Sequence, residues 1–165
     1  LWYNRVSILD DYKYSLGGKN GYTPKAGKTL VSGAEKKGLS LTAVSLDDGD
    51  IYNTHIKLYD YGFDTFSRYM VVNKDSFFYE DQYYGERLYV NESYYYPVKE
   101  DEKDKLRVVI QIVRGIDLTK SNKVGNLIVY FDEEEVFRED LFIEKKSVGD
   151  KSFFTKVKEF FLKIF

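Results

Sequence analysis

Short extended runs separated by turn residues make up most of this 165-residue chain and favour folds built on antiparallel sheets. The first three runs are predicted at Ser15 to Gly21, Lys28 to Ala34 and Leu39 to Leu46. Glycine or proline stands in each connection, and both connections are short enough for a meander of neighbouring strands. An aromatic content of 18%, much of it tyrosine, also favours β structure. We therefore expect three consecutive strands of one antiparallel sheet.

A single helical pattern follows these strands. Asp47-Asp48-Gly49-Asp50 supplies acidic residues and a candidate N-terminal cap, and apolar residues at helical spacing begin at Ile51. Gly62 is a typical helix stop. The pattern predicts a helix from about Ile51 to Tyr61 that covers the sheet.

From Ser67 onward the pattern changes to short β-rich runs between charged or glycine-containing turns, which is typical of a small sandwich. The charged stretches Lys99 to Lys105 and Thr119 to Gly125 are predicted to be solvated hairpin tips. We therefore predict three domains: 1–66 with the first sheet and helix, 67–144 rich in strands, and 145–165 with a terminal helix. The predicted strands of the second domain are Arg68 to Val72, Glu86 to Val90, Tyr94 to Val98, Leu106 to Val113, Asn126 to Phe131 and Glu135 to Phe142.

The last segment has the pattern of an amphipathic helix with a cationic polar side. It carries six lysines against two acidic residues, a net charge of +4, whereas residues 1–144 carry −6. We expect it to lie on an anionic membrane surface, because it is too short and too charged to span a bilayer. The alternative is a helix that docks its phenylalanine face on the protein. The predicted membrane-binding residues are Phe153, Phe154, Val157, Phe160, Phe161, Ile164 and Phe165, with Lys156 and Lys163 among the lysines.

Composition excludes several other classes of site. The chain has no cysteine, so it can form neither a disulfide nor a thiolate metal centre. With a single histidine and no other ligand cluster, we expect no metal and no cofactor. The acidic body also argues against nucleic acid as a partner. The first residues lack the features of a signal peptide, so any export signal is expected upstream of Leu1.

Three further features invite a functional interpretation, and for each we favour a structural one. His55 could act in acid–base catalysis, but it shares a helix face with Ile51 and Tyr59, which favours packing or hydrogen bonding. Four consecutive carboxylates from Asp132 to Glu135 are more typical of a solvated turn than of a cation site. The tyrosine-rich stretches at 83–84 and 94–96 could stack on sugars, but we expect them to fill the core and rim of the β domain.

One string carries a resemblance to a known family. Leu16-Gly17-Gly18-Lys19-Asn20-Gly21-Tyr22-Thr23-Pro24-Lys25-Ala26-Gly27-Lys28-Thr29-Leu30-Val31 resembles the Lys-Thr-Gly box of the penicillin-binding proteins and the turn and strand after it. In that family the box lies on a strand beside the active-site cleft. By resemblance, Lys19 supplies a positive charge for a substrate carboxylate, Asn20 donates a hydrogen bond to it, and Gly21 leaves room for the substrate. Thr23 is a further candidate donor.

The resemblance extends over nearly the whole chain. Leu1-Trp2 before the box and the helix from Tyr52 to Phe63 are similar to those of low-molecular-weight serine D-Ala-D-Ala carboxypeptidases. It implies an α+β chain with three parts. These are the C-terminal part of a transpeptidase-like domain with antiparallel strands and a covering helix, a small all-β sandwich-like domain, and a terminal amphipathic anchor helix.

The family's Ser-x-x-Lys and Ser-x-Asn motifs precede the box and are missing here, so the nucleophile serine and its lysine base are expected upstream of Leu1. The resemblance thus implies part of an enzyme that removes the terminal D-Ala from peptidoglycan pentapeptides, reacts with β-lactams, and works at the extracytoplasmic face of the bacterial membrane. Its partners would include the missing N-terminal part of the catalytic domain. The chain alone is predicted to be inactive. Because Asn20 stands where the family has Thr, a non-catalytic cell-wall binding or scaffolding protein remains the alternative.

Overall fold

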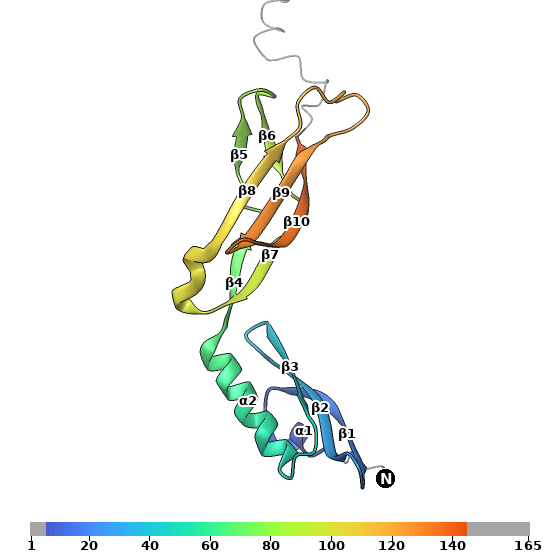
Figure 1. Ribbon diagram of the computed structural model, residues 1–165. Coiled ribbons are helices and arrows are strands. Elements are labelled where there is room, and N and C mark those ends of the chain that lie inside the picture. The colour runs from blue at the N-terminus through green and yellow to red at the C-terminus, as the bar shows by residue number, and fades with distance from the viewer. Residues whose placement is uncertain (1–5, 145–165) are drawn as a thin grey trace, which may run out of the picture. The chain divides into compact units, whose positions relative to one another are not determined.

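The computed structural model describes residues 6–144, so Leu1-Trp2 and the predicted terminal helix lie outside the described residues. Within this range the chain is mostly β, with few helices (Figure 1). The predicted domain boundaries after residues 66 and 144 stay predictions. The described residues form two compact units, one of residues 6–72, 94–107 and 131–133, the other of 73–93, 108–130 and 134–144.

The first unit contains a three-stranded antiparallel sheet. Its strands are β1 (Ser15–Thr23), β2 (Gly27–Lys36) and β3 (Leu39–Ser45), in that order across the sheet, which confirms the predicted meander. Lys37 and Gly38, which join β2 to β3, both have positive φ, as the tight turns between antiparallel strands require. A four-residue helix, α1 (Ile8–Asp11), precedes β1 and was not predicted.

Helix α2 (Ile51–Thr65) packs against β2 and β3 and covers one face of the sheet (Figure 1). Its buried residues recur every three or four positions, which places them on one side of the helix. They meet inward-pointing residues of the strands in a continuous core. That core comprises Val6, Ile8, Tyr12, Leu30, Ala34, Ala43, Ile51 and Tyr59.

The predicted end of this helix at Tyr61 is wrong, because α2 continues to Thr65. Gly62 is buried, and a Cβ atom there would lie 2.5 Å from Cδ1 of Leu41 on β3. The glycine therefore permits close approach of helix and sheet instead of ending the helix. The N–H of Phe66 donates to the carbonyl oxygen of Gly62 at 2.9 Å and closes the last turn.

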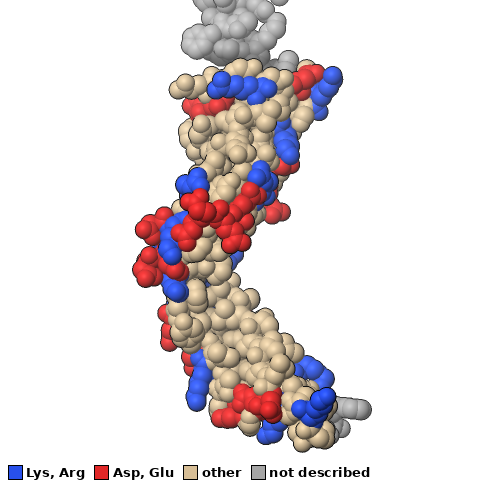
Figure 2. All heavy atoms as spheres, in the orientation of Figure 1, with Lys and Arg blue, Asp and Glu red and all other residues tan. Residues whose placement is uncertain are grey.

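A two-stranded antiparallel ribbon follows, made of β4 (Ser67–Val72) and β7 (Tyr94–Val98). After β7 comes a 3₁₀ helix, η1 (Glu100–Lys105), where a hairpin tip was predicted, so that prediction is wrong. Acids and lysines three residues apart stabilise this turn: Lys103 pairs with Glu100 at 2.7 Å and Lys105 with Glu102 at 3.1 Å. Figure 2 shows acidic and basic side chains gathered over η1.

A five-stranded sheet of order β5-β6-β10-β9-β8 forms the remaining β structure. Leu127, Ile128 and Val129 on β9 are all fully buried, so both faces of the sheet are covered at this strand. Strand β5 was not predicted, and β9 begins inside the second predicted hairpin tip. The strands are β5 (Tyr79–Asp81), β6 (Glu86–Tyr89), β8 (Leu106–Ile112), β9 (Lys123–Phe131) and β10 (Glu134–Ile143).

The acidic run between β9 and β10 lies on the surface. Asp132 has a φ of 51° and occupies the turn with Glu133, whereas Glu134 and Glu135 already belong to β10. All four residues are exposed. Among the described residues no cluster of His, Cys, Asp or Glu side chains could hold a metal ion, and no helix is long and apolar enough to cross a membrane.

Candidate substrate-binding strand

Strand β1 forms one edge of the three-stranded sheet and carries Lys19, Asn20 and Gly21, three of the predicted substrate-binding residues. Opposite them on β2 lie Val31, Leu30 and Thr29 in turn. Among the described residues β1 pairs with no other strand, so its outer edge faces away from the sheet. An edge strand of this kind can take up an extended ligand or a further chain segment.

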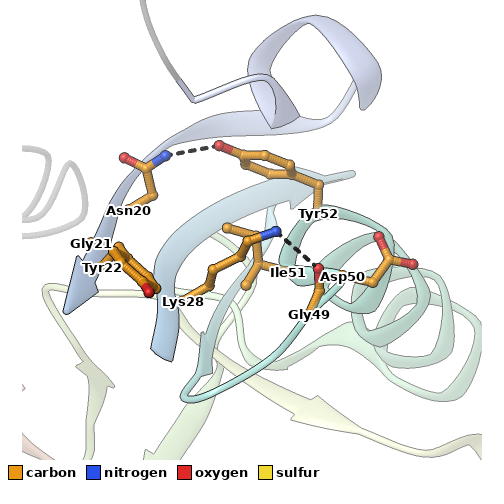
Figure 3. Close-up of a pocket in the computed structure, with 8 residues that line it drawn as sticks. All are labelled: Asn20, Gly21, Tyr22, Lys28, Gly49, Asp50, Ile51 and Tyr52. Carbon is orange, nitrogen blue, oxygen red and sulfur yellow. Dashed lines mark hydrogen bonds between the residues drawn. The ribbon is translucent and has the colours of Figure 1, made fainter. Parts of the chain in front are cut away.

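Lys19 and Asn20 project from opposite faces of the sheet, as neighbouring residues on a strand do. The side chain of Asn20 points toward α2, where its Nδ2 donates to the hydroxyl oxygen of Tyr52 at 3.0 Å (Figure 3). Lys19 is exposed on the other face, and its Nζ donates to the backbone carbonyl oxygen of Asn20 at 2.6 Å. The structure therefore separates the two side chains that were predicted to act on one carboxylate.

The other two predicted residues lie toward the turn after β1. Gly21 is exposed, and its carbonyl oxygen accepts a hydrogen bond from the hydroxyl of Thr29 at 3.3 Å. Thr23 ends β1, and its Oγ1 accepts the backbone N–H of Ala26 at 3.0 Å. The hydroxyl of Thr23 thus holds the turn between β1 and β2. The predicted membrane-binding residues, Phe153 to Phe165, lie outside the described residues.

The sheet face on the Lys19 side carries exposed apolar side chains. We call it the open face and define it by Leu16, Lys19, Val31, Val44 and Leu46. The apolar members are 64%, 43%, 62% and 74% exposed in that order, which is high for branched aliphatic side chains in or beside a central sheet. A depression of about 390 Å³ lies on it, bordered by Lys19 on β1, Val31 on β2 and Val44 on β3.

A second cavity lies on the α2 side of β1 (Figure 3). It measures about 750 Å³ and is bordered by β1, the start of β2 and the first turn of α2. Lys28 spans it and donates from Nζ to the carbonyl oxygen of Gly49 at 3.3 Å. Asn20 and Tyr52 face each other across it, so the amide of Asn20 belongs to this cavity. Its lining residues are Asn20, Gly21, Tyr22, Lys28, Gly49, Asp50, Ile51 and Tyr52.

Behind β1 lies a buried chain of polar side chains that joins β2, β3 and α2. Ser32 Oγ is 2.7 Å from Nδ1 of His55 and 2.7 Å from the hydroxyl oxygen of Tyr59. Nε2 of His55 is 3.1 Å from Oγ of Ser45. The side chains of Ser32, His55 and Tyr59 are almost completely buried. These hydrogen bonds satisfy groups that would be costly to bury alone, and they fix the register of helix against sheet.

Burial determines the charge state of this network. It lowers the pKa of His55 because the imidazolium loses hydration, and the negative charge of Asp48 offsets only part of this effect. Burial likewise raises the pKa of Tyr59, although the hydrogen bond with Ser32 opposes the change. Burial thus favours the neutral form of the His55 imidazole, which has no surface exposed to solvent. Its structure agrees with the packing and hydrogen-bonding interpretation and gives it no route to a substrate.

The sequence contains a pattern that places the members of this network on facing surfaces, although only His55 was considered above as a candidate functional residue. Ser32 alternates with Leu30 and Ala34 on the inward face of a predicted strand, and His55 and Tyr59 lie four residues apart on a predicted helix. The contact between Asn20 and Tyr52 had no such signal. It joins residues 32 positions apart and depends on where α2 begins relative to β1.

The strand-rich second half of the chain matches a known protein family. Residues 66–148, half of the chain, match the family described as penicillin-binding protein 5, C-terminal domain. The chain belongs to the penicillin-binding protein 5 family. This agrees with the resemblance that the Lys19 string carries in the other half. No curated protein sequence matches the chain.

Solved structures of penicillin-binding proteins share the fold over more than the family's C-terminal domain. The D-alanyl-D-alanine carboxypeptidase DacD from Francisella tularensis matches 87% of this chain with a TM-score of 0.59 and 20% identity. Penicillin-binding protein 5 from Haemophilus influenzae matches 85% (TM-score 0.58, 15% identity), and penicillin-binding protein 6B from Escherichia coli 84% (0.52, 18%). The chain spans only 38%, 44% and 38% of those three proteins, respectively.

Proposed function

We propose that this chain is part of a serine D-Ala-D-Ala carboxypeptidase that removes the terminal D-Ala from peptidoglycan pentapeptides through an acyl-enzyme. One observation carries the proposal: Lys19 lies exposed on an edge strand, beside an apolar sheet face that the described residues leave uncovered. Family membership supports it, as does the likeness of the fold to a carboxypeptidase structure.

In this proposal Lys19 attracts the C-terminal carboxylate of the peptide. Within the described residues Lys19 forms no ion pair, so its ammonium group is available to an anion. Gly21 leaves room for the peptide along the edge of β1, and Thr23 stays a candidate donor from the turn. A fixed cation at a carboxylate is worth far more in a site that excludes water than on an open surface.

The serine nucleophile and its lysine base would come from a part of the catalytic domain that this chain does not contain. The chain spans 38% and 44% of two solved relatives, which leaves ample chain in them for such a part. We propose that this part packs on the open face and buries Val31 and Val44. The cleft would then form between it and β1, with β-lactams entering the same site as the peptide.

A second candidate is a non-catalytic cell-wall binding or scaffolding protein. The bond between Asn20 and Tyr52 favours it, because the side chain that replaces the family's Thr points away from Lys19. Replacing Asn20 with Thr separates the candidates. In a catalytic protein Asn20→Thr preserves or raises the acylation rate, whereas a degenerate cleft stays inactive with either residue.

The same proposal assigns roles to the strand-rich region and the terminal segment, and it locates the protein at a membrane. The strand-rich region would be a small sandwich that carries the catalytic part, and the segment 145–165 would bind the anionic lipids of the extracytoplasmic face. Its nine apolar side chains and six lysines suit that surface.

Labelling with a reporter penicillin tests the proposal. The 165-residue chain should form no covalent adduct by intact-mass spectrometry, because the family's Ser-x-x-Lys motif is missing from it. The same chain extended by the residues encoded before Leu1 should gain one penicilloyl group. An adduct on the short chain would contradict the assignment of the nucleophile, and no adduct on the extended protein would favour the scaffolding candidate.

A further inference from the structure

Exposed aromatic and aliphatic side chains gather at one end of the five-stranded sheet. Phe78 is 67% exposed, Tyr83 54%, Val113 52% and Tyr79 38%. They come from the β5–β6 hairpin and from the connection after β8, which lie at the same end of the sheet as the last residue of β10 (Figure 1). We call Phe78, Tyr79, Tyr83 and Val113 the aromatic rim.

The two segments of the aromatic rim are held together by specific bonds. The hydroxyl of Tyr84 donates to the carbonyl oxygen of Val113 at 2.6 Å, which ties the hairpin to the β8–β9 connection. Oδ1 of the buried Asp81 accepts the backbone N–H groups of Tyr83 and Tyr84 at 3.0 and 3.1 Å, so the hairpin turn has a fixed shape. These hydrogen bonds hold the two segments of the aromatic rim in one arrangement.

Two arginines lie against the rings of the rim. The guanidinium carbon of Arg87 is 5.7 Å from the ring centre of Phe78, and that of Arg114 is 5.4 Å from the ring centre of Tyr83. Figure 2 shows basic and acidic side chains interspersed with uncharged surface at this end. Rings flanked by long cationic side chains suit the boundary between hydrocarbon and lipid headgroups. Glu80 and Glu86 lie on the same hairpin and offset the charge of the arginines. Burial of the rings would therefore contribute more to the free energy of membrane binding than the net charge of the rim.

The chain leaves the sheet at the rim. The backbone N–H of Ile143 donates to the carbonyl oxygen of Asn122 at 2.9 Å, and that of Glu144 to the carbonyl oxygen of Arg87 at 3.0 Å. The end of β10 therefore lies between the β8–β9 connection and β6. The 21 residues that follow include nine apolar residues and carry a net charge of +4.

We propose that the aromatic rim is a second membrane contact, which rests on the anionic bilayer to which the segment 145–165 binds. The inference depends on the membrane attachment in the proposed function and goes beyond it. Because Glu144 is hydrogen-bonded to Arg87 on β6, binding of the residues after it to lipid would keep the aromatic rim close to the bilayer. The rim adds an attachment through the folded sheet, so this end of the β domain faces the bilayer.

Fluorescence quenching by brominated lipid tests the contact directly. Trp2 is the only tryptophan, so Trp2→Phe provides a silent background in the full chain. Single reporters would be Phe78→Trp in the rim, Phe154→Trp in the terminal segment, and Val108→Trp as a control. Val108 is 42% exposed on β8, five residues before Val113 and therefore about 16 Å away along the strand. The probe is vesicles of equal parts phosphatidylglycerol and brominated phosphatidylcholine.

We expect quenching at positions 78 and 154 and none at 108. Quenching at 154 alone would overturn the rim contact and leave the terminal attachment standing. Quenching at neither 78 nor 154 would overturn both.

Vesicle sedimentation provides an independent measurement. The double variant Phe78→Asp with Tyr83→Asp should lower the partition coefficient of the full chain by about fivefold, because it removes two rings that would be buried in the lipid interface. The matched control is Leu58→Asp with Tyr61→Asp, which changes side chains 47% and 65% exposed on α2, and it should bind as the parent does. If the rim variant instead lost retention on insoluble peptidoglycan and kept its vesicle binding, the rim would be a glycan platform and the proposal would be wrong.

Discussion

Among single residues, Asn20 and His55 show how burial and orientation decide what a polar side chain can do. Asn20 was expected to face a substrate carboxylate, but its amide donates to Tyr52 on the α2 side of β1. His55 is the only histidine, and it is enclosed between Ser32 and Ser45. Both residues hold the sheet and helix together, which leaves Lys19 as the exposed polar side chain of the box.

The lowered pKa of His55 predicts how stability depends on pH. Its folded pKa lies below its unfolded value of about 6.5, so the unfolded state takes up a proton first. The contribution of neutral His55 is fully present above about pH 6.5 and is lost as pH falls through the window below that value. Urea melts of the chain between about pH 7 and pH 5 should therefore show a falling free energy of unfolding. His55→Gln should flatten this slope, and an unchanged slope would show that other groups cause it.

At the level of elements, close approach between β1 and β2 sets the position of Lys19. A Cβ atom on Gly18 would lie 2.7 Å from the carbonyl oxygen of Val31 and 2.8 Å from Cβ of Ser32. Neither atom can move without shifting β2, since the side chain of Ser32 is hydrogen-bonded to His55 and Tyr59. The glycine before Lys19 is therefore required by packing.

We predict that Gly18→Ala lowers the free energy of unfolding by about 1–3 kcal/mol, because the added methyl group overpacks the strand pair. Chemical denaturation followed by circular dichroism measures the change. Gly49→Ala is the matched control, because a Cβ atom at Gly49 would meet nothing within 4 Å. Equal stabilities of the two variants would contradict the packing account.

Most elements could be predicted from the sequence, and the misses have physical causes. Alternation and glycine punctuation located β1, β2 and β3, because tight turns leave a strong local signal. Gly62 misled the prediction of the helix end, since a glycine that stops a helix and one that packs against Leu41 look alike in sequence. Strand β5 has three residues, too few to show a period. The hydrogen bond between Asn20 and Tyr52 depends on tertiary packing and could not be predicted.

For the whole molecule, the family match and the charge distribution distinguish three parts of the sequence. Residues 66–148 match the family's C-terminal domain, the Lys19 strand lies outside that match, and the segment from Lys145 carries the excess of positive charge.

We predict that removing the last 20 residues leaves the described residues folded and abolishes most binding to anionic vesicles. Burial of several phenylalanines contributes roughly 1.5 to 3 kcal/mol each at most, before the cost of ordering the segment, and each lysine near the surface adds about 1 kcal/mol. High salt should weaken binding of the intact chain. Sedimentation with vesicles and thermal melts measure both effects. Equal partitioning of the two forms, or loss of the β fold on deletion, would indicate that the segment docks on the protein instead.

The most direct test of the central claim is the rate at which penicillin acylates the extended protein with Lys19 present or replaced. Lys19→Ala should slow acylation by about tenfold or more, because a fixed cation at a developing or bound anion is commonly worth ~2 to 4 kcal/mol. Lys25→Ala, which removes an exposed lysine from the adjacent turn, should acylate at the parent rate. An unchanged rate in Lys19→Ala, in a protein that is still acylated, would show that Lys19-Asn20-Gly21 is only part of a strand and would contradict its role in substrate binding.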